Sequence, residues 1–292
     1  MKIPEAVLRR VAHVCGAEVV GSAPVSGGCI SNTARVELAG RNPVFLKWSV
    51  TRVHPPALFA EEARSLAVIA ETETVRVPRV LDQHAADDYA WLLLEWLAPG
   101  ARSARSQALL GERLAALHRS SAENFGWPAD NFIGSLPQSN HAHDNWAEFW
   151  REERLLPQLA LAGTRLSTKD RRRLEELADH TDEILGDVTG EPPSLLHGDL
   201  WSGNVHIMAD GTPAVIDPAS YYGHREVDLA MSRLFGGFSD DFYRAYQRAW
   251  PSLPGLEKRI AMYQLYYLLV HVNLVGGGYT SQTMSVAAQL GF

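Results

Sequence analysis

The 292-residue chain has few cysteines, no long apolar run and no excess of positive charge. Its two cysteines, Cys15 and Cys29, cannot build a disulfide framework, which indicates a reducing compartment and a cytoplasmic location. No apolar run reaches the roughly 18 residues of a membrane span, and the N-terminus lacks the apolar core of a signal peptide. The formal net charge of −7 at pH 7 argues against a nucleic-acid partner, because such a partner requires a basic surface.

Apolar residues, by contrast, are plentiful, and their spacing changes once along the chain. They make up 46% of the sequence, enough to build the core of one large or two modest domains. Up to residue 98, alternating apolar residues predict strands, and two stretches have helical spacing. The predicted strands are 18–20, 34–38, 44–48, 79–84 and 89–96, and the predicted helices are 4–15 and 56–71.

Pro99 and Gly100 interrupt the chain, and we expect the boundary between two lobes at this point. The fold class predicted is α+β, with a small antiparallel β-sheet lobe and its helix over 1–98, and a larger, mainly helical lobe over 99–292. The helices predicted in the second lobe are 168–186, 226–235, 239–249 and 256–275.

Residues 195–204, LLHGDLWSGN, form the most informative string in the chain. Phosphoryl transfer from a nucleotide needs one carboxylate to accept the proton of the attacking hydroxyl, and an amide and a second carboxylate to hold Mg²⁺. Asp199 is the candidate base, and Asn204, five residues later, is the candidate amide. Asp217 ends an apolar run after a turn and is the candidate second carboxylate. Short extended segments on both sides of that turn predict a hairpin that flanks it with Asn204 and Asp217.

The predicted β lobe contains features that suit a nucleotide. A glycine-rich turn lets the backbone approach phosphates and present N–H groups to them, although such a turn alone is a weak signal. Lys47 lies in the apolar strand that follows, and we interpret it as a phosphate contact held by a helix glutamate. Glu62 is favoured for that glutamate, with Glu61 as the alternative. The turn contains Gly27, Gly28, Cys29 and Ile30.

Two further segments receive roles from their position. The strand before Pro99 ends at the expected lobe junction, where the backbone of Glu95, Trp96 and Leu97 could hydrogen-bond a nucleotide base. Asp228 begins a predicted helix, and we interpret it as a brace that accepts backbone N–H groups near His197. His197 itself is interpreted as structural.

The order of these features is similar to that in protein-kinase-like small-molecule kinases, which include aminoglycoside and choline kinases. More closely, the chain resembles the fructosamine kinase (ketosamine 3-kinase) family from about residue 4 to 280. The tryptophan after HGDL and the string GHREVDLA distinguish this family from the aminoglycoside kinases. The matching segments are 27–32, 59–62, 114–119, 125–127, 130–135, 137–140, 197–204, 216–219 and 221–231.

The resemblance implies a specific activity. The family transfers the γ-phosphate of ATP to the 3-hydroxyl of a ketosamine, and the product then decomposes and frees the amine, so the activity amounts to deglycation. ATP and Mg²⁺ are the implied cofactors, and a small-molecule ketosamine or glycated amine is the implied partner. The sugar, the free or protein-bound state of the amine and the oligomeric state stay open.

By position, the resemblance also implies residue roles. Asp199 would be the base, with Asn204 and Asp217 on Mg²⁺. The glycine-rich turn and Lys47 would contact the phosphates, with Lys47 paired to Glu62, and residues 95–97 would hold adenine. We expect Trp201 to stack on the sugar, with a core role as the alternative, and we assign His224 to the substrate. Cys29 permits either a monomer or a redox-sensitive dimer.

Two other functions compete with this interpretation. The first is a kinase of the same fold that acts on an aminoglycoside or a choline-like amine. Aminoglycosides require an acidic acceptor site, and the only acidic group available, residues 144–153, could equally be a solvated helix face. The second is a nucleotide-binding pseudokinase that acts as a regulator. It predicts the loss of a catalytic residue, and none is missing.

Overall fold

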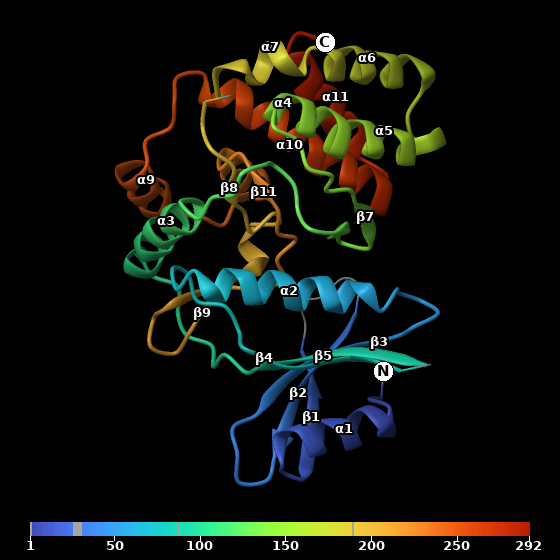
Figure 1. The fold of residues 1–292 in the computed structure, drawn as a ribbon, viewed down its shortest axis with the longest axis vertical. Coiled ribbons are helices and arrows are strands. Elements are labelled where there is room, and N and C mark those ends of the chain that lie inside the picture. Colours follow the sequence, from blue (N-terminus) through green and yellow to red (C-terminus); the bar gives the residue numbers. More distant parts are fainter. Residues whose placement is uncertain (1, 26–30, 87, 189) are drawn as a thin grey trace.

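The N-terminal part of the computed structural model is an antiparallel five-stranded sheet with a helix on each face (Figure 1). The structure describes residues 2–25, 31–86, 88–188 and 190–292. The strand order in the sheet is β1-β2-β3-β5-β4. The strands are β1 Val19–Pro24, β2 Asn32–Leu38, β3 Val44–Val50, β4 Val80–Ala85 and β5 Tyr89–Glu95.

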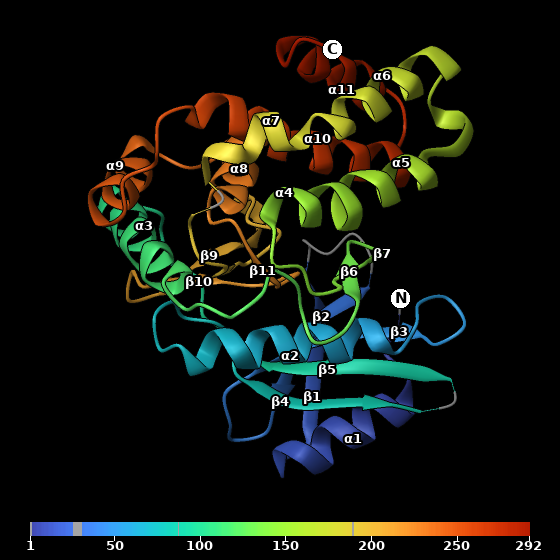
Figure 2. The same ribbon diagram turned by 45° about the horizontal axis from the view of Figure 1, so that its top comes forward.

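The two helices of this lobe are α1 (Glu5–Cys15) and α2 (Ala57–Glu71), and they cover opposite faces of the sheet (Figure 2). Strand β5 shows why, because its side chains alternate between the faces. Trp91 and Leu93 pack with α1, whereas Leu92 and Leu94 belong to the core that α2 shares with the rest of the chain. The predicted sheet and both predicted helices are confirmed, with ends within a few residues of the expected ones.

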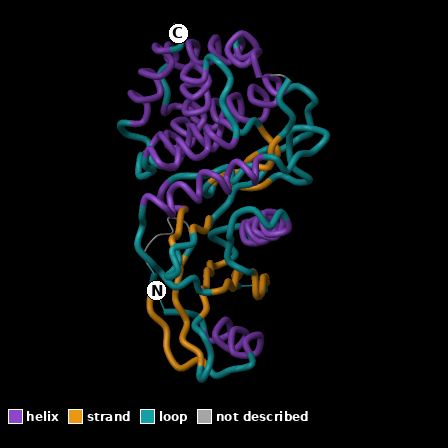
Figure 3. Tube along the Cα trace, turned by 90° about the vertical axis from the view of Figure 1, so that its left-hand side faces the viewer, coloured by secondary structure: helices purple, strands orange, loops and turns teal. Residues whose placement is uncertain are grey.

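The rest of the chain is mainly helical, and Figure 3 shows its helices gathered at the end opposite the sheet. Its helices are α3 Ala104–His118, α4 Trp146–Phe149, a π-helical turn Trp150–Leu155, α5 Leu156–Ala162, α6 Thr168–Asp179, α7 Thr181–Leu185, α8 Glu226–Leu234, α9 Asp240–Ala249, α10 Leu256–Leu274 and α11 Tyr279–Gln289. Short 3₁₀ turns occupy Gly163–Arg165, Gly186–Val188 and Ser202–Asn204. Within the described residues, no helix combines the length and apolarity needed to cross a bilayer.

Among the described residues of this helical part, three two-stranded ladders are formed. They pair β6 (Asn131–Ile133) with β7 (Leu136–Gln138), β8 (Ser194–Leu195) with β11 (Tyr222–Gly223), and β9 (Val205–Ile207) with β10 (Pro213–Val215). The β9–β10 ladder is the hairpin predicted between Asn204 and Asp217.

One predicted helix is wrong in detail. The helix expected over 168–186 is two helices, α6 and α7, because His180 leaves the helical conformation at φ −101° and ψ 18°. The Thr181 hydroxyl then donates to the Ala178 carbonyl across the break. The other three predicted helices are confirmed as α8, α9 and α10.

The β9–β10 hairpin also joins the two parts of the chain. The Gly100 N–H donates to the Ile207 carbonyl at 2.7 Å, and the Ala209 N–H donates to the Ala98 carbonyl at 2.9 Å. At its other end, the Val215 N–H donates to the Arg76 carbonyl at 2.9 Å. A Cβ atom at Gly100 would lie 2.1 Å from the Met208 carbonyl oxygen, so glycine permits this close approach.

Candidate active site

The loop that carries Asp199 is held by a buried carboxylate. The backbone N–H groups of His197 and Gly198 donate to Asp228 at 2.8 and 2.9 Å. Nε2 of His118 lies 3.1 Å from the same carboxylate. The brace predicted for Asp228 is therefore confirmed. His197 is fully buried, and its Nε2 hydrogen-bonds the Ile216 carbonyl at 2.9 Å, which confirms its structural role.

Tyr267 holds the same loop from the other side. Its hydroxyl donates to the Gly198 carbonyl at 2.7 Å, and its side chain is buried. Gly198, the residue before Asp199, is thus fixed at both its N–H and its C=O group. Tyr267 could not be predicted from the sequence, because it lies in a helix whose residues are apolar on most sides and only the tertiary fold brings it to the loop.

The loop conformation requires glycine at position 198. Gly198 has a φ of +83°, in the left-handed region. A Cβ atom there would lie 2.1 Å from the Ala219 carbonyl oxygen, and this atom belongs to backbone that cannot move aside easily. The Ala219 N–H in turn donates to the His197 carbonyl at 2.9 Å, so the two segments are joined at this point.

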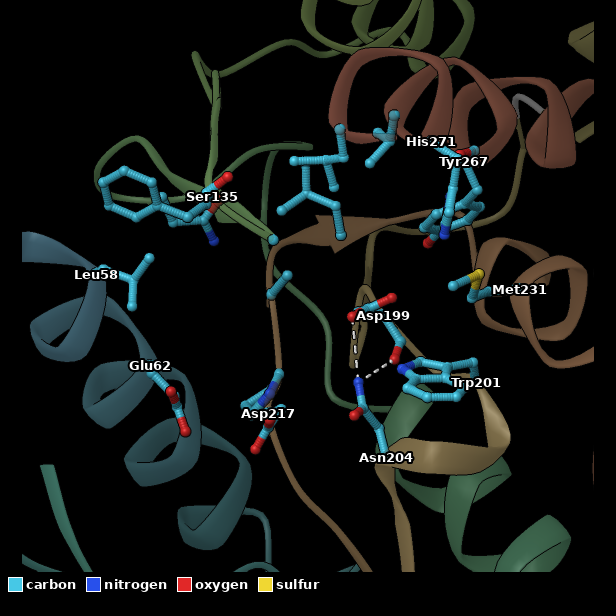
Figure 4. Close-up of a pocket in the computed structure, with 18 of the residues that line it drawn as sticks. Leu58, Glu62, Ser135, Asp199, Trp201, Asn204, Asp217, Met231, Tyr267 and His271 are labelled. Carbon is cyan, nitrogen blue, oxygen red and sulfur yellow. Dashed lines mark hydrogen bonds between the residues drawn. The ribbon is translucent and has the colours of Figure 1, made fainter. Parts of the chain in front are cut away.

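Asp199 is partly buried and faces the cavity beside Asn204 (Figure 4). The Asn204 side-chain N–H₂ donates to the Asp199 backbone carbonyl at 2.8 Å and to its carboxylate at 3.2 Å. Burial, together with the charge of Asp217, raises the pKa of Asp199 to about 7, although the hydrogen bond from Asn204 opposes the shift. A carboxylate with this pKa is suited to accept a proton near neutral pH.

Lys47 and two carboxylates form the opposite wall. The Lys47 ammonium donates to Glu62 and to Asp217, each at 2.7 Å. Burial disfavours the charged lysine, but the two carboxylates outweigh it and hold the pKa of Lys47 above its ordinary value. Glu61 instead lies 3.4 Å from the Arg64 guanidinium, so the structure selects Glu62 over Glu61 as the partner of Lys47.

Asp217 follows β10 in an unusual backbone conformation. Its φ is +56°, a left-handed value that asparagine and aspartate tolerate better than other non-glycine residues. The preceding Ile216 N–H donates to the Asn204 carbonyl at 3.0 Å, which brings the two predicted metal-binding residues together. Strained residues of this kind concentrate at functional sites.

These residues line one cavity of about 700 Å³. Figure 4 shows Glu62 on one side, Asp217 in the centre, and Asp199 and Asn204 opposite Glu62. Trp201 lies beside Asn204 and lines the cavity as well. Its ring covers Gly203, where a Cβ atom would lie 2.2 Å from the indole, so the orientation of the ring depends on that glycine.

Other predicted site residues lie elsewhere. Residues 95–97 do not line the cavity, and the Glu95 carboxylate pairs with the Arg76 guanidinium at 2.6 Å. Leu97 is buried, and Trp96 packs with Phe45. The predicted phosphate turn, Gly27, Gly28, Cys29 and Ile30, lies outside the described residues.

The substrate contact predicted for His224 is wrong. His224 is 2% exposed and does not line the cavity. Its two ring nitrogens are already occupied, Nε2 by Glu191 at 3.0 Å and Nδ1 by the Tyr263 hydroxyl at 2.9 Å. Neither partner could be recognised in the sequence, because each lies more than thirty residues away.

Comparison with known proteins identifies the fold and the family. A family model described as fructosamine kinase matches residues 5–290. The chain belongs to the fructosamine kinase family. Like other kinases of this family, it is an ATP-dependent phosphotransferase with the two-lobed, protein-kinase-like fold.

Its relatives span nearly its whole length. The protein-ribulosamine 3-kinase of Arabidopsis thaliana chloroplasts is 38% identical over 90% of this chain and 80% of its own. The ketosamine-3-kinase of Mus musculus is 32% identical over 98% of this chain and 99% of its own. A crystal structure of a candidate fructosamine-3-kinase from Thermobifida fusca is 36% identical, covers 99% of both chains and has a TM-score of 0.88.

Proposed function

We propose that this fructosamine kinase family member phosphorylates the 3-hydroxyl of ketosamines, the sugar–amine adducts formed in glycation. The observation that carries the proposal is the cavity in which Asp199 faces the Lys47–Asp217 ion pair. Relatives named ketosamine-3-kinase and protein-ribulosamine 3-kinase support the choice of acceptor.

In this proposal Asp199 is the general base. Its carboxylate accepts the proton of the substrate 3-hydroxyl, and the resulting oxygen forms a bond to the γ-phosphorus of ATP while the bond from that phosphorus to the β,γ-bridging oxygen breaks. The fixed peptide of Gly198 keeps the carboxylate in position, and Asn204 orients it through the hydrogen bond at 3.2 Å. Positioning is a large part of catalysis in such reactions.

Lys47, held by its ion pair with Glu62, would contact the phosphates, and Asn204 and Asp217 would hold Mg²⁺. The donor set fits, because no described residue hydrogen-bonds the second carboxylate oxygen of Asp217 or the amide oxygen of Asn204. Mg²⁺ commonly takes only one or two carboxylates and completes its coordination with water and phosphate. When bound, the ion neutralises the charge that develops on the phosphates.

The remaining roles are also proposals. Trp201 would stack on the sugar, since it lines the cavity directly after the Asp199 loop. The backbone of residues 95–97 would bind adenine, and residues 27–30 would lie against the phosphates.

We further propose a monomer in reducing conditions, with a dimer through Cys29 as the alternative. Size-exclusion chromatography of the Cys29→Ser variant, with and without oxidant, separates these two states.

The proposed reaction can be tested by ATP consumption across a panel of acceptors. We expect turnover with ribulosamine, erythrulosamine or fructosamine adducts, and none with aminoglycosides or choline. The panel also ranks the sugars, and comparing free with protein-bound adducts shows which form the enzyme prefers. Turnover of only an aminoglycoside or choline would contradict the proposal, as would nucleotide binding without turnover of any acceptor.

The Asp199→Asn variant is the matched control for the base. Asparagine has nearly the same shape but cannot accept the proton, so kcat should fall by roughly 10²–10⁴-fold. Nucleotide binding and thermal stability should stay close to those of the wild type. Full activity of this variant would show that Asp199 is not the base.

A further inference from the structure

The cavity continues beyond Asp199 along a wall that the proposed reaction leaves without a role. Helices α8, α10 and α11 build this wall. Three rings form a ladder on it: Phe235 and His271 have centroids 4.9 Å apart, and His271 and Tyr279 have centroids 4.8 Å apart. Phe235 is 40% exposed, although it is a large apolar side chain. We call Phe235, His271 and Tyr279 the ring ladder.

The carboxylates of the cavity come from other segments than the ring ladder. The carboxylates among the described lining residues are Glu61, Glu62, Asp199 and Asp217. Glu61 and Glu62 lie on α2, Asp217 pairs with Lys47, and Asp199 is the proposed base. The ladder and its lining neighbours Met231, Val270, Leu274 and Val275 contribute no formal negative charge.

A ketosamine nevertheless carries a positive charge close to the reacting hydroxyl. Its amine is protonated at neutral pH, and only two sugar carbons separate the nitrogen from the carbon that bears the 3-hydroxyl. When the 3-hydroxyl contacts Asp199, the ammonium must therefore lie in the same cavity. Aromatic faces can bind such a cation without a carboxylate, through the electrostatic attraction of the ring quadrupole.

His271 adds a directed hydrogen-bond acceptor to the ladder. Its Nδ1 lies 2.7 Å from the backbone carbonyl of Tyr267, and since a carbonyl can only accept, Nδ1 carries the proton. With a proton on Nδ1, Nε2 is the nitrogen that can accept a hydrogen bond, and no described residue hydrogen-bonds it. The side chain lines the cavity beside Tyr267 (Figure 4).

We infer that the ring ladder is the subsite for the protonated amine of the ketosamine. His271 accepts a hydrogen bond from the substrate N–H through Nε2, and the rings of Phe235 and Tyr279 flank the cation. The apolar residues around the ladder contact the group attached to the amine. This inference rests on the proposed function, because it assumes that a ketosamine occupies the cavity.

The test compares a charged substrate with an uncharged analogue. Phe235→Leu and Tyr279→Leu keep apolar bulk but remove the ring, and Tyr279→Phe keeps the ring as a matched control. We expect each leucine variant to raise KM for the ketosamine about five- to tenfold, with kcat and KM for ATP unchanged. For a ketose ether, in which oxygen replaces the amine, the inhibition constant should stay within about twofold of the wild-type value.

His271→Leu should have the same effect on the ketosamine, and His271→Gln, which retains an acceptor, should restore part of the affinity. If the leucine variants weaken the ether and the ketosamine equally, the ladder provides only apolar packing and the inference is wrong. Unchanged KM for the ketosamine would also overturn it. Absence of ketosamine turnover in the wild-type enzyme is a different result, since that contradicts the proposed function itself.

Discussion

Charged side chains in the interior of this protein take their states from their immediate partners. Arg225 is fully buried, and its guanidinium donates to both oxygens of Glu191 at 2.8 and 2.9 Å. Nε2 of His224 donates to the same carboxylate at 3.0 Å, because an ionised carboxylate can only accept. Burial alone would raise the pKa of Glu191, but the hydrogen bonds from His224 and Arg225 outweigh burial and lower it to about 2. The cluster therefore holds the carboxylate ionised well into acid.

This shift predicts how Glu191→Gln changes stability with pH. Because the folded pKa lies below the unfolded value, Glu191 stabilises the protein fully above about pH 4.5, and the contribution is lost as pH falls towards 2. At pH 7 the variant should lose on the order of 2–3 kcal/mol of unfolding free energy. Urea denaturation at several pH values measures the difference in unfolding free energy between wild type and variant. This difference should become smaller below pH 4.5. A difference that stays constant from pH 7 to 3 would contradict the assignment.

The role of a single residue can be predicted from the sequence when its partners in the site lie close to it in the chain. Asp199 and Asn204 stand five residues apart, and a hairpin brings Asp217 to them, so all three could be found from spacing. His224 could not be interpreted correctly, because Glu191 and Tyr263 reach it only in the folded chain. The ring ladder could not be predicted for the same reason, since its three residues come from three different helices or their ends.

At the scale of the elements, the tight turn before Asp199 is sensitive to substitution at its glycine. Gly198 and Gly211 share a φ of +83°, so alanine is strained at both positions. Only Gly198 also faces backbone, whereas nothing lies within 4 Å of a Cβ atom at Gly211. Comparing alanine substitutions at these two glycines therefore separates the effect of backbone strain from the effect of close packing.

We expect Gly211→Ala to cost about 1–2 kcal/mol of stability and to leave kcat unchanged. Gly198→Ala should cost more and should lower kcat at least tenfold, because the clash with Ala219 displaces the Asp199 loop. Thermal unfolding and ATP consumption of the two variants provide the comparison. Equal losses of stability and of kcat in both variants would mean that the close approach of Gly198 to Ala219 has no importance for the site.

Elements with strong periodicity were predictable, and short ones were not. The alternation in β3 and β5 and the apolar stripes of α2 and α10 identified those elements from the sequence. Strands β6 and β7 have three residues each, too few for any alternation to emerge. Helix α11, YTSQTMSVAAQ, has small and polar residues on all sides and depends on contacts with α10.

Over the whole molecule, nucleotide binding should be linked to stability through Asp217. The Asp217→Asn variant suits this test, because asparagine also tolerates the φ of +56° and avoids added backbone strain. ATP at about a hundred times its Kd should raise the Tm of the wild type by roughly 5 °C. In the wild type we expect ATP to raise the Tm more in the presence of Mg²⁺ than in the presence of EDTA. In the Asp217→Asn variant we expect the two rises in Tm to be equal. A full Mg²⁺-dependent rise in the variant would exclude Asp217 as a ligand.

The lobe boundary at Pro99 and Gly100 stays a prediction, and the structure explains why sequence alone could not define the lobes further. The core on the α2 face of the sheet is continuous with that of the helical part, so Leu92 and Leu94 belong to one cluster with residues of α10. A sequence shows where apolar residues are placed, but not which distant element will cover them.

The β9–β10 hairpin has a mechanical consequence for this arrangement. Backbone hydrogen bonds tie the hairpin to Arg76, Ala98 and Gly100, whereas Asp228 and Tyr267 tie Gly198, the residue before Asp199, to the helical part. The chain is thus tied to the helical part at Gly198 and to residues 76–100 between Ile207 and Val215. Ile216 and Ala219, on either side of Asp217, are both hydrogen-bonded to His197, so a rotation of the sheet would leave Asp217 beside Asp199 and would strain its ion pair with Lys47. Nucleotide affinity would then depend on the angle between the sheet and the helical part, because Lys47 and Asp217 are the proposed contacts of the phosphates and Mg²⁺.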